Sequence, residues 1–562
     1  MTDRLKIVVI GGVAAGPKAA ARARRLEPNA DITIIEKDKY ISYAGCGMPF
    51  YLSGQTREFE ELFTTSYGVA RKEDYFLNEK GIKVLTGTEA VAIDRVNKRV
   101  EIADLSTDNR SFIEYDKLVI ATGSTPTIPP IEGLDLAGVY RLNHPEDVLS
   151  IKAALAENVD EVAIIGAGLI GMEAADALMK LKVFANIIEL KDQVLPGMLD
   201  PDLAALLAMR LEDNGLELSL GRKVLGLTGE NGRVSAVVTD QGPIEAGMVI
   251  VAIGVRPNVK LAGEAGLEIG ATGAIAVNEY LQTSDPDIYA LGDCVENTHL
   301  VSGQKVYIPL ASTANRQGRV AGDNITGLKT KFKGILGSSV LKVMGLNVAR
   351  TGLGEEQARN LGYDVITSVN PTFDATHYYP QHGKILLKII ADAKTKRVLG
   401  GQGFGPGDVA KRIDVLAAAI NFGATLEDVA NIDTAYAPPF NTPIDPLHHS
   451  VNIIRNKLQG LAEGILPADV KKKFDSDADF VFLDVRTEQQ FRPKHISDAR
   501  VLSIPLGEIR RRLDEIPREK EIITSCVLGP RGYEALRILK GAGFDNVKFM
   551  EGSLEAWPYE IE

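Results

Sequence analysis

Residues 161–171 read Glu161-Val-Ala-Ile-Ile-Gly-Ala-Gly-Leu-Ile-Gly171, an apolar run that leads directly into three glycines. Such a continuous apolar run is typical of a buried parallel strand. Glycine is needed where a backbone turns tightly and approaches a pyrophosphate, and the N-terminus of the next helix favours phosphate. A further strand ends at Glu189, the usual place for an acid that binds a ribose hydroxyl. The pattern therefore predicts a dinucleotide-binding unit, and Glu189 favours NADH because it would repel the 2′-phosphate of NADPH.

A related pattern begins the chain, at Lys6-Ile-Val-Val-Ile-Gly-Gly-Val-Ala-Ala-Gly16. Val13 stands where the second glycine of the pattern belongs, so this copy is weaker on its own. The next strand supports it, because that strand ends at Glu36, about 20 residues further along the chain. We therefore predict two dinucleotide-binding units, and the alternative is a pair of glycine-rich turns that bind nothing.

Two more segments indicate how these units are joined. Lys117-Leu-Val-Ile-Ala-Thr-Gly-Ser124 predicts a buried strand that ends near Gly123, and Asp287-Ile-Tyr-Ala-Leu-Gly-Asp293 predicts another that ends in an acid. With these four motifs in order, residues 1 to about 450 resemble the pyridine nucleotide-disulfide oxidoreductases.

The resemblance implies an α/β fold with two nested Rossmann-like domains. An FAD-binding domain (1–115 and 250–330) is then split around an NADH-binding domain with connecting strands (116–249), and Asp293 binds the ribityl chain of FAD. The other cofactor-binding residues that the resemblance implies are Gly11, Gly12, Ala14, Gly16, Glu36, Lys37, Ala121, Thr122 and Gly123 in the first unit, and Gly166, Gly168, Gly171 and Glu189 in the second.

The composition is that of an ordinary multidomain globular protein. The chain has 562 residues, too many for one hydrophobic core, with 45% hydrophobic and 25% charged residues. Its sequence has no apolar run near the ~20 residues that cross a bilayer and no signal-peptide pattern. A formal net charge of −12 disfavours nucleic acid, which binds to concentrated cationic surfaces. We expect a cytoplasmic protein that binds neither nucleic acid nor membrane.

The chain has only three cysteines, Cys46, Cys294 and Cys526, which suit neither a disulfide framework nor a metal site. Cys294 is interpreted as a small buried apolar residue. Cys46 lies in Ser42-Tyr-Ala-Gly-Cys46-Gly-Met-Pro-Phe-Tyr51, soon after Glu36. Thiolate chemistry needs a lowered pKa, and Pro49 suits the first turn of a helix whose N-terminus would face Cys46. The alternative is a structural cysteine in a glycine-rich loop.

The residue five positions after Cys46 restricts the chemistry. The glutathione reductase branch of the family has a second cysteine there, whereas this chain has Tyr51. Oxidised Cys46 must then be a mixed disulfide, a persulfide or a sulfenate. The segment closely resembles the single-cysteine coenzyme A disulfide reductases and the related persulfide or polysulfide reductases. Their sibling branch, the NADH peroxidases and oxidases, has a catalytic histidine where this chain has Ala14, so the resemblance favours sulfur substrates over peroxide.

The same resemblance implies a coenzyme A site near the first helix. Lys18, Arg22 and Arg25 fall on one helix face, and three cations suit a 3′-phospho-ADP group, although a solvated basic face is the alternative. Ser42, Gly45 and Asn315 match further positions that contact the substrate in the coenzyme A enzymes. Gly45 replaces an asparagine often found there, and Asn315 stands about where these enzymes have a histidine, so these differences concern substrate identity.

Residues 331–450 resemble the family's dimerisation domain, with strands expected near 384–390 and 398–402 and a helix from Val409. The resemblance implies a homodimer in which tyrosines from one subunit protonate the leaving thiolate in the other. By alignment these are Tyr378 or Tyr379, and Tyr436. A positioned phenol with a pKa of about 10 can do this, and packing is the alternative role.

After a linker (451–465), residues 466–562 resemble a single α/β rhodanese domain. The strand Glu521-Ile-Ile-Thr-Ser leads into the loop Cys526-Val-Leu-Gly-Pro-Arg-Gly532 and then a helix from near Tyr533. Backbone N–H groups at a helix N-terminus favour an anionic sulfur or a persulfide, and Arg531 would add positive charge.

The sequence therefore predicts an FAD-dependent oxidoreductase that uses NADH to reduce persulfide, polysulfide or coenzyme A disulfide bonds through Cys46, with Cys526 handling sulfane sulfur. Two alternatives remain open at this point. One is an NADH oxidase or peroxidase that uses a Cys46 sulfenate, and the other is a sulfur carrier or redox sensor. No metal is expected.

Overall fold

The computed structural model describes residues 4–157 and 159–562, which form two compact units. One unit contains the residues up to Leu190 and those from Gly221 to Gly337. The other contains Lys191–Leu220 and Ser338–Glu562. Among the described residues, no helix has the length and apolar character needed to cross a membrane.

The first unit contains a five-stranded parallel sheet in the order β18-β7-β1-β2-β3. Its strands are β18 (Ile288–Ala290), β7 (Lys117–Ile120), β1 (Lys6–Ile10), β2 (Asp31–Ile35) and β3 (Lys83–Leu85). Ile10 is in register with Ile35 and Ile120, so the residues that follow these strands meet at one edge. The sequence predicted that the first part of the FAD-binding domain ends at residue 115. β7 follows that residue but still belongs to this sheet, because all four of its residues pair with β1.

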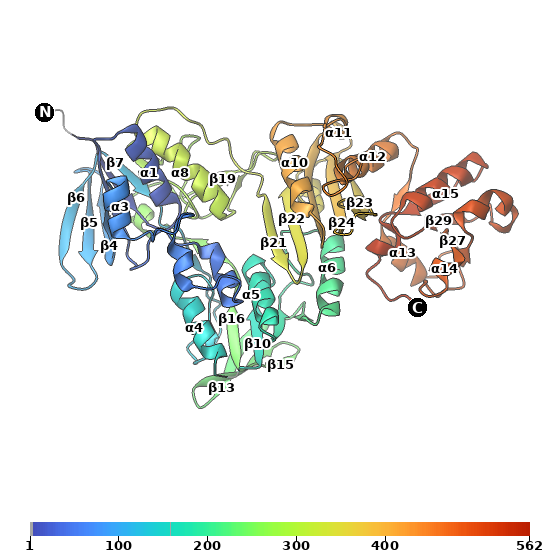
Figure 1. Ribbon diagram of the computed structural model, residues 1–562, viewed down its shortest axis with the longest axis horizontal. Coiled ribbons are helices and arrows are strands. Elements are labelled where there is room, and N and C mark those ends of the chain that lie inside the picture. The colour runs from blue at the N-terminus through green and yellow to red at the C-terminus, as the bar shows by residue number, and fades with distance from the viewer. Residues whose placement is uncertain (1–3, 158) are drawn as a thin grey trace. The chain divides into compact units, whose positions relative to one another are not determined.

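Alternate residues of β1 enter two separate cores. Ile7 and Val9 pack with α1 (Ala15–Leu26) and α8 (Ala311–Ile325), which lie side by side in Figure 1. Val8 and Ile10 pack on the opposite face with the antiparallel sheet of β4 (Thr88–Asp94), β5 (Arg99–Asp104) and β6 (Arg110–Glu114). α3 (Glu73–Lys80) and α7 (Lys260–Glu264) complete this half.

A second parallel sheet, with the order β11-β10-β16-β9, carries the other glycine motif. It consists of β11 (Phe184–Ile188), β10 (Glu161–Ile165), β16 (Met248–Val251) and β9 (Val139–Tyr140), with α4 (Pro145–Leu155) and α5 (Leu169–Lys180). The sequence predicted that the NADH-binding domain ends at residue 249, but β16 continues through this boundary. An antiparallel hairpin sheet of β13 (Val224–Glu230), β14 (Arg233–Thr239) and β15 (Gly242–Glu245) packs against this sheet.

Short paired strands link the two halves of this unit. β8 (Ser124–Pro126) pairs with β17 (Val255–Pro257), so the chain leaves and re-enters the first half side by side. A second short pair, β19 (Asn297–Thr298) and β20 (Lys305–Val306), precedes α8. Strands before β8 and after β17 therefore share the first sheet, and the strands of the second sheet lie between them in the chain.

The second unit contains an antiparallel sheet with the order β21-β22-β25-β24-β23. Its strands are β21 (Ser339–Val343), β22 (Leu346–Gly352), β25 (Val398–Gly405), β24 (Lys384–Asp392) and β23 (Val365–Phe373). The helices are α9 (Glu355–Asn360), α10 (Val409–Asn421), α11 (Leu426–Ala430) and α12 (Pro446–Leu458), and this unit also holds α6 (Pro201–Asp213) and β12 (Glu217–Ser219). The expected strands and the helix start at Val409 are confirmed.

One fully buried lysine joins α6 and α9 to this sheet. Lys388 Nζ on β24 lies 3.1 Å from Asp200, 2.8 Å from Asp202 and 2.8 Å from Glu355. A buried ammonium is tolerated only when anions surround it, and these carboxylates raise the pKa of Lys388 against the opposing effect of burial.

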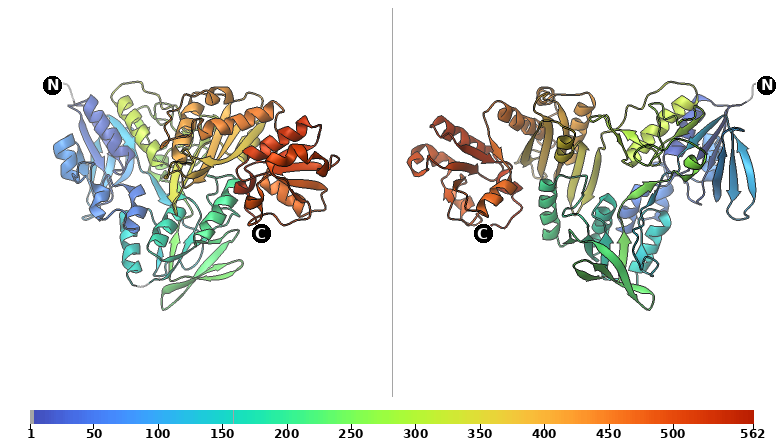
Figure 2. Two further views of the ribbon diagram at one scale, coloured as in Figure 1. Left: turned by 45° about the vertical axis from the view of Figure 1, so that its right-hand side comes forward. Right: turned by 180° about the vertical axis from the view of Figure 1, so that it is seen from behind.

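The C-terminal domain is a parallel sheet with the order β26-β30-β29-β27-β28. The strands are β26 (Gly464–Ile465), β30 (Val547–Met550), β29 (Glu521–Ser525), β27 (Phe480–Asp484) and β28 (Val501–Ser503). Alternating residues of β27 separate two cores, one with α15 (Pro530–Gly541) and one with α13 (Pro467–Phe474), and these helices lie on opposite faces in Figure 2. The helix after Cys526 starts at Pro530, earlier than the expected Tyr533, because proline suits a first turn.

Candidate active site

The first glycine turn follows β1 and packs against the neighbouring strand ends. Gly11 has φ +107°, and a Cβ there would overlap the carbonyl oxygen of Ala121. The Gly12 N–H donates to Glu36 Oε2 at 2.6 Å, which places the acid beside the turn. Burial raises the pKa of Glu36, with its backbone hydrogen bonds opposing that shift. The turn has the form that a pyrophosphate and a ribose hydroxyl require.

The other members of this predicted set lie at the same edge. A Cβ at Gly16 would overlap the carbonyl oxygen of Gly11, so helix α1 can approach the strand only with glycine there. Ala14 precedes the first residue of α1, and Lys37 follows Glu36 as an exposed side chain.

The second glycine turn has the same geometry, with more open space around its middle glycine. Gly166 has φ +111°, and a Cβ at this position would lie 2.5 Å from the Ala252 carbonyl oxygen. A Cβ at Gly171 would overlap the Gly166 carbonyl, whereas one at Gly168 would meet no atom within 4 Å. The Ala167 N–H donates to Glu189 Oε2 at 2.8 Å. Open space above Gly168 beside a helix N-terminus fits a pyrophosphate.

Asp293 lies just beyond β18, where the FAD-binding acid is expected. Ser124 Oγ donates to Asp293 Oδ2 at 3.3 Å, and burial raises the pKa of the carboxyl group. Thr122 and Gly123 lie in the neighbouring loop, where Thr122 Oγ1 donates to the Asn258 carbonyl at 2.7 Å and Gly123 has φ +67°. A half-buried carboxyl group at this edge suits the hydroxyl groups of a ribityl chain, so the donor set fits FAD.

The neighbouring cysteine has a structural position. Cys294 is fully buried, and its Sγ lies 3.3 Å from the carbonyl oxygen of Leu291. The prediction of a small buried residue is confirmed.

Cys46 lies in a single 3₁₀ turn, η1 (Gly45–Gly47), directly before α2 (Met48–Leu52). Cys46 is an exposed residue, and Pro49 lies in the first turn of α2 as expected. The expected lowering of the Cys46 pKa is wrong for the polypeptide alone. Partial burial of the thiol raises this pKa, and the charges of Glu173 and Asp293 raise it further.

Tyr51 fills the position of the missing second cysteine with a packed ring. Its side chain is buried, with its ring centroid 5.4 Å from that of Phe59. Lys152 Nζ lies 3.9 Å from the Tyr51 ring centroid, a cation–π contact. This position belongs to the core of the first unit, so Cys46 has no partner cysteine within the loop.

Glu173 is a site residue that the sequence analysis missed. It lies on α5, in the second half of this unit, yet its charge acts on Cys46. Burial, followed by repulsion from Asp176, raises the pKa of Glu173 to about 7. The available signal was an acid in the second turn of a mostly apolar helix, one turn before Asp176.

The proposed coenzyme A residues lie on α1 and α8, which pack closely because α8 carries glycines. A Cβ at Gly318 would lie 2.7 Å from Lys18 Cβ, and one at Gly322 would lie 2.6 Å from Arg22 Cβ. Lys18 and Arg25 are exposed, whereas Arg22 Nε bonds Asp323 Oδ1 at 2.5 Å. Arg22 is therefore neutralised locally, which differs from the expected set of three available cations.

Two further residues of the coenzyme A prediction lie beside the first glycine turn. Ser42 is buried with φ +52°, and its N–H donates to the Gly12 carbonyl at 2.8 Å. Gly45 begins the turn that carries Cys46. On α8, Asn315 is exposed, and the exposed Arg319 lies one turn further on the same face. Arg319 was missed, although its spacing of four from Asn315 was visible in the sequence.

The structure distinguishes between the candidate tyrosines of the second unit. Tyr378 and Tyr436 are both exposed, and the hydrogen bond that the Tyr436 hydroxyl makes with Tyr378 raises the pKa of Tyr436. Tyr379 is partly buried, and its carbonyl lies 2.5 Å from His382 Nδ1. The two paired phenols are therefore Tyr378 and Tyr436.

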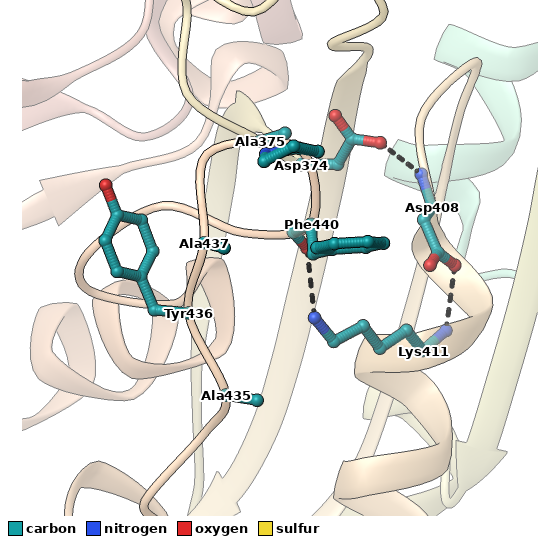
Figure 3. A pocket seen from close by; sticks show the side chains of 9 residues that line it. Asp374, Ala375, Asp408, Lys411, Ala435, Tyr436, Ala437 and Phe440 are labelled. Atoms are coloured by element: carbon teal, nitrogen blue, oxygen red, sulfur yellow. Dashed lines mark hydrogen bonds between the residues drawn. The ribbon is translucent and has the colours of Figure 1, made fainter.

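Beside Tyr436 is a pocket of about 460 Å³ that includes Asp374, Asp408, Lys411 and Phe440 (Figure 3). Lys411 Nζ donates to the Phe440 carbonyl at 3.0 Å, and the Tyr436 hydroxyl points away from this ammonium group. The Lys411 ammonium therefore bonds the loop that carries Tyr436 and not the Tyr436 phenol.

Cys526 is buried at the end of β29, in the loop before α15. The Gly529 N–H donates to Cys526 Sγ at 3.1 Å, as expected for a backbone anion site. Arg531 instead donates to Gln490 Oε1 at 2.8 Å, so its predicted role at the sulfur is not seen in this arrangement. Within the described part of the chain, no cluster of histidine, cysteine and acidic residues suits a metal ion.

Three models of known protein families match successive parts of the chain. Residues 5–318 match the model described as pyridine nucleotide-disulphide oxidoreductase, residues 338–445 match its dimerisation domain, and residues 466–559 match the rhodanese-like domain. The chain therefore belongs to the pyridine nucleotide-disulphide oxidoreductases, an FAD-dependent family that uses NAD(P)H.

Individual relatives cover most of the chain. The NAD(P)H sulfur oxidoreductase (CoA-dependent) of Pyrococcus furiosus is 38% identical over 453 residues, which are 79% of this chain and 98% of the relative. An NADH oxidase of Methanocaldococcus jannaschii is 37% identical over 79% of this chain and 97% of its own length.

Two solved structures cover almost the whole chain, including the rhodanese-like domain. An NAD-dependent persulfide reductase from A. fulgidus matches with a TM-score of 0.94 and 44% identity over 98% of this chain and 100% of that chain. The reduced CoADR-RHD of Bacillus anthracis matches with a TM-score of 0.92 and 33% identity over 99% of this chain and 98% of that chain.

Proposed function

We propose that this oxidoreductase reduces persulfide, polysulfide or coenzyme A disulfide bonds at Cys46 with electrons from NADH, and that Cys526 handles sulfane sulfur. For a persulfide R–S–SH, the net reaction consumes NADH and one proton and yields NAD⁺, R–SH and H₂S. The single observation that carries this proposal is the accessible Cys46 with the packed Tyr51 at the place of a second cysteine.

The glycine turns and acids described above would hold the two cofactors. Glu36, Asp293 and the turn from Gly11 to Gly16 fit FAD, and Glu189 with the turn from Gly166 to Gly171 fits NADH. When bound, FAD carries two electrons from NADH to the sulfur on Cys46. The chain itself supplies the nucleophile, the orientation of the substrate and the protons.

Cys46 begins the reaction as a thiolate that attacks one sulfur of the S–S bond. A mixed disulfide forms on Cys46, and hydrosulfide or a thiolate leaves with the electron pair of the broken bond. Two electrons then cleave the mixed disulfide, which restores Cys46 and releases the second thiolate. Tyr436, held by Tyr378, would protonate that leaving group from the other subunit of a homodimer.

The coenzyme A assignment rests on α1 and α8. Lys18, Arg25 and Arg319 are exposed cations on two closely packed helices, and phosphate groups bind such charges. The Pyrococcus and Bacillus proteins carry coenzyme A in their names, which supports the same substrate class here.

The test is a comparison of wild type with Cys46→Ser in steady-state NADH oxidation. We expect that coenzyme A persulfide accelerates NADH oxidation by wild type, and that Cys46→Ser loses at least about a thousandfold of this rate while NADH still reduces the flavin. Mass spectrometry should find the substrate-derived thiol on Cys46. Equal rates in both proteins would overturn the proposal.

An NADH oxidase is the second candidate, since a relative with that name is 37% identical. Ala14 disfavours peroxide chemistry, because the residue offers no group that transfers a proton. Oxygen consumption measured beside sulfide release decides between them. Oxygen-dependent turnover that rivals the persulfide rate would favour the oxidase. A flavin turnover that no sulfur donor accelerates would favour a sulfur carrier or sensor.

A further inference from the structure

The sulfur of Cys526 has a second neighbour besides the Gly529 N–H. Ser553 Oγ lies 3.8 Å from Cys526 Sγ and accepts the Cys526 N–H at 3.2 Å. Ser553 is fully buried and lies at the first residue of the 3₁₀ turn η5 (Ser553–Ala556), which follows β30. One buried hydroxyl therefore contacts both the backbone and the side chain of the cysteine.

The backbone of Ser553 has an unfavourable conformation for a residue other than glycine. Its φ is +50°, in the left-handed region where glycine is favoured and other residues cost energy. A serine in this conformation needs a compensating interaction. Among the residues that the structure describes, its hydroxyl contacts Cys526 and the Met550 carbonyl, which lies 3.4 Å from Ser553 Oγ.

The turn around Ser553 is fixed on two sides. On the cysteine side, the Leu554 N–H donates to the Cys526 carbonyl at 3.2 Å and the Glu555 N–H to the Val527 carbonyl at 3.0 Å. On the other side, the Glu555 carboxylate lies 2.9 Å from Arg210 and 2.8 Å from Lys384. The hydroxyl therefore does not depend on a mobile loop for its position.

Two acceptors lie near the hydroxyl proton of Ser553. While Cys526 is a neutral thiol, the hydroxyl can donate to the Met550 carbonyl. When the sulfur becomes anionic, it is the stronger acceptor, and rotation of the hydroxyl brings the proton to it. The hydroxyl thus interacts more strongly with the anion than with the thiol.

We propose that Ser553 is a positioning residue that steadies the thiolate of Cys526 for sulfane sulfur transfer. This inference deepens the proposed function and rests on its assignment of sulfur handling to Cys526. The Cys526 thiolate attacks the terminal sulfur of R–S–SH, the bond between the two donor sulfurs breaks, and R–S⁻ leaves with its electron pair. The product is the Cys526 persulfide, no redox change occurs, and the departing thiolate takes a proton from solvent.

Three charged residues that come after β30, β27 and β29 each bond another group. Glu551 bonds Lys457 at 2.5 Å, Arg486 bonds Asp484 at 2.7 Å, and Arg531 bonds Gln490 at 2.8 Å. Within the described residues, the polar groups within hydrogen-bonding distance of the sulfur are thus the Gly529 N–H and the Ser553 hydroxyl. A neutral donor steadies the anion without introducing a fixed charge that would bind a leaving thiolate.

The experiment uses the full-length holoenzyme with Cys46→Ser as background, so that Cys526 is the reactive thiol and Cys294 stays buried. Glutathione persulfide is the probe, and mass spectrometry follows the gain of one sulfur atom on the peptide that contains Cys526. Ser553→Ala and Ser553→Gly should each slow this loading about tenfold, the effect of one charge-assisted hydrogen bond. The pH profile of loading should move to higher pH by about one unit.

Ser553→Gly separates chemistry from folding, because glycine relieves the positive φ and keeps the turn. Its thermal midpoint should equal or exceed that of the background protein while its loading stays slow. Wild-type loading rates and an unmoved pH profile in both variants would overturn the role of Ser553. A background protein that takes up no sulfur on Cys526 would instead refute the proposed sulfur handling itself.

Discussion

Glu173 acts on Cys46 from another part of the first unit, so a single side chain links the thiol to the second glycine motif. The charge of Glu173 raises the pKa of Cys46, and Glu173→Gln removes that charge. We expect the rate of Cys46 alkylation by iodoacetamide to reach its midpoint at a lower pH in Glu173→Gln. Glu27→Gln, an exposed carboxylate on the surface, is the matched control and should leave the profile in place.

The same carboxyl group gives a pH dependence of stability. Its folded pKa of about 7 lies above the ordinary glutamate value of 4.5, so the folded state holds the proton more tightly than the unfolded chain. Stability from this group is therefore present below about pH 4.5 and is lost as the pH rises to about 7. Glu173→Gln should flatten that decline by about 1–3 kcal/mol between pH 5 and pH 8. Denaturant unfolding at both pH values measures it, and parallel curves for the two proteins would contradict it.

We propose that Glu189 sets the preference for NADH over NADPH. Its carboxylate accepts the Ala167 N–H at the second glycine turn. Because a negative charge repels a 2′-phosphate, Glu189→Arg should raise the ratio of kcat/KM for NADPH over NADH by at least about tenfold. Glu189→Gln removes charge without adding any and should give a smaller change. An unaltered ratio in both variants would separate Glu189 from coenzyme recognition.

At the scale of elements, the close packing of α1 and α8 depends on glycine. A Cβ at Gly318 would lie 2.7 Å from the Ala15 carbonyl oxygen and from Lys18 Cβ, with little room to move. Gly318→Ala should destabilise the protein by about 1–3 kcal/mol through overpacking. Gly541→Ala in α15 meets no atom within 4 Å and should be neutral or stabilising, because alanine favours helix. Equal denaturation midpoints for the two variants would contradict this account.

The buried lysine of β24 makes a second prediction at this scale. Lys388→Met leaves Asp200, Asp202 and Glu355 without their cation, and we expect a loss of about 3–5 kcal/mol in unfolding free energy. Lys384→Met on the same strand removes a half-exposed ion pair with Glu555 and should cost less than about 1 kcal/mol. Denaturant unfolding of both variants is the measurement.

For the whole molecule, the dimerisation domain makes the origin of the proton donor testable. Cys46→Ser and Tyr436→Phe are each expected to be inactive with persulfide. If Tyr436 serves the other subunit, unfolding and refolding an equal mixture gives hybrid dimers with one complete site, and about a quarter of wild-type activity returns. Absence of recovery, with hybrid dimers verified by mass spectrometry, would place the phenol in the same subunit as its thiol.

The sequence by itself determined the α/β fold class and the oxidoreductase, dimerisation and rhodanese-like domains. It also predicted roles for Cys46 and Cys526, which are the subject of the experiments above. These features are local, because a glycine turn after an apolar strand or a tyrosine in place of a cysteine can be identified from neighbouring residues. Only the tertiary structure showed that the charge of Glu173 acts on Cys46 and that Tyr378 pairs with Tyr436. It also showed that Arg531 bonds Gln490 and that Ser553 contacts Cys526. The physical reason is that desolvation and hydrogen bonding depend on residues distant in the chain, and packing alone decides which of them meet.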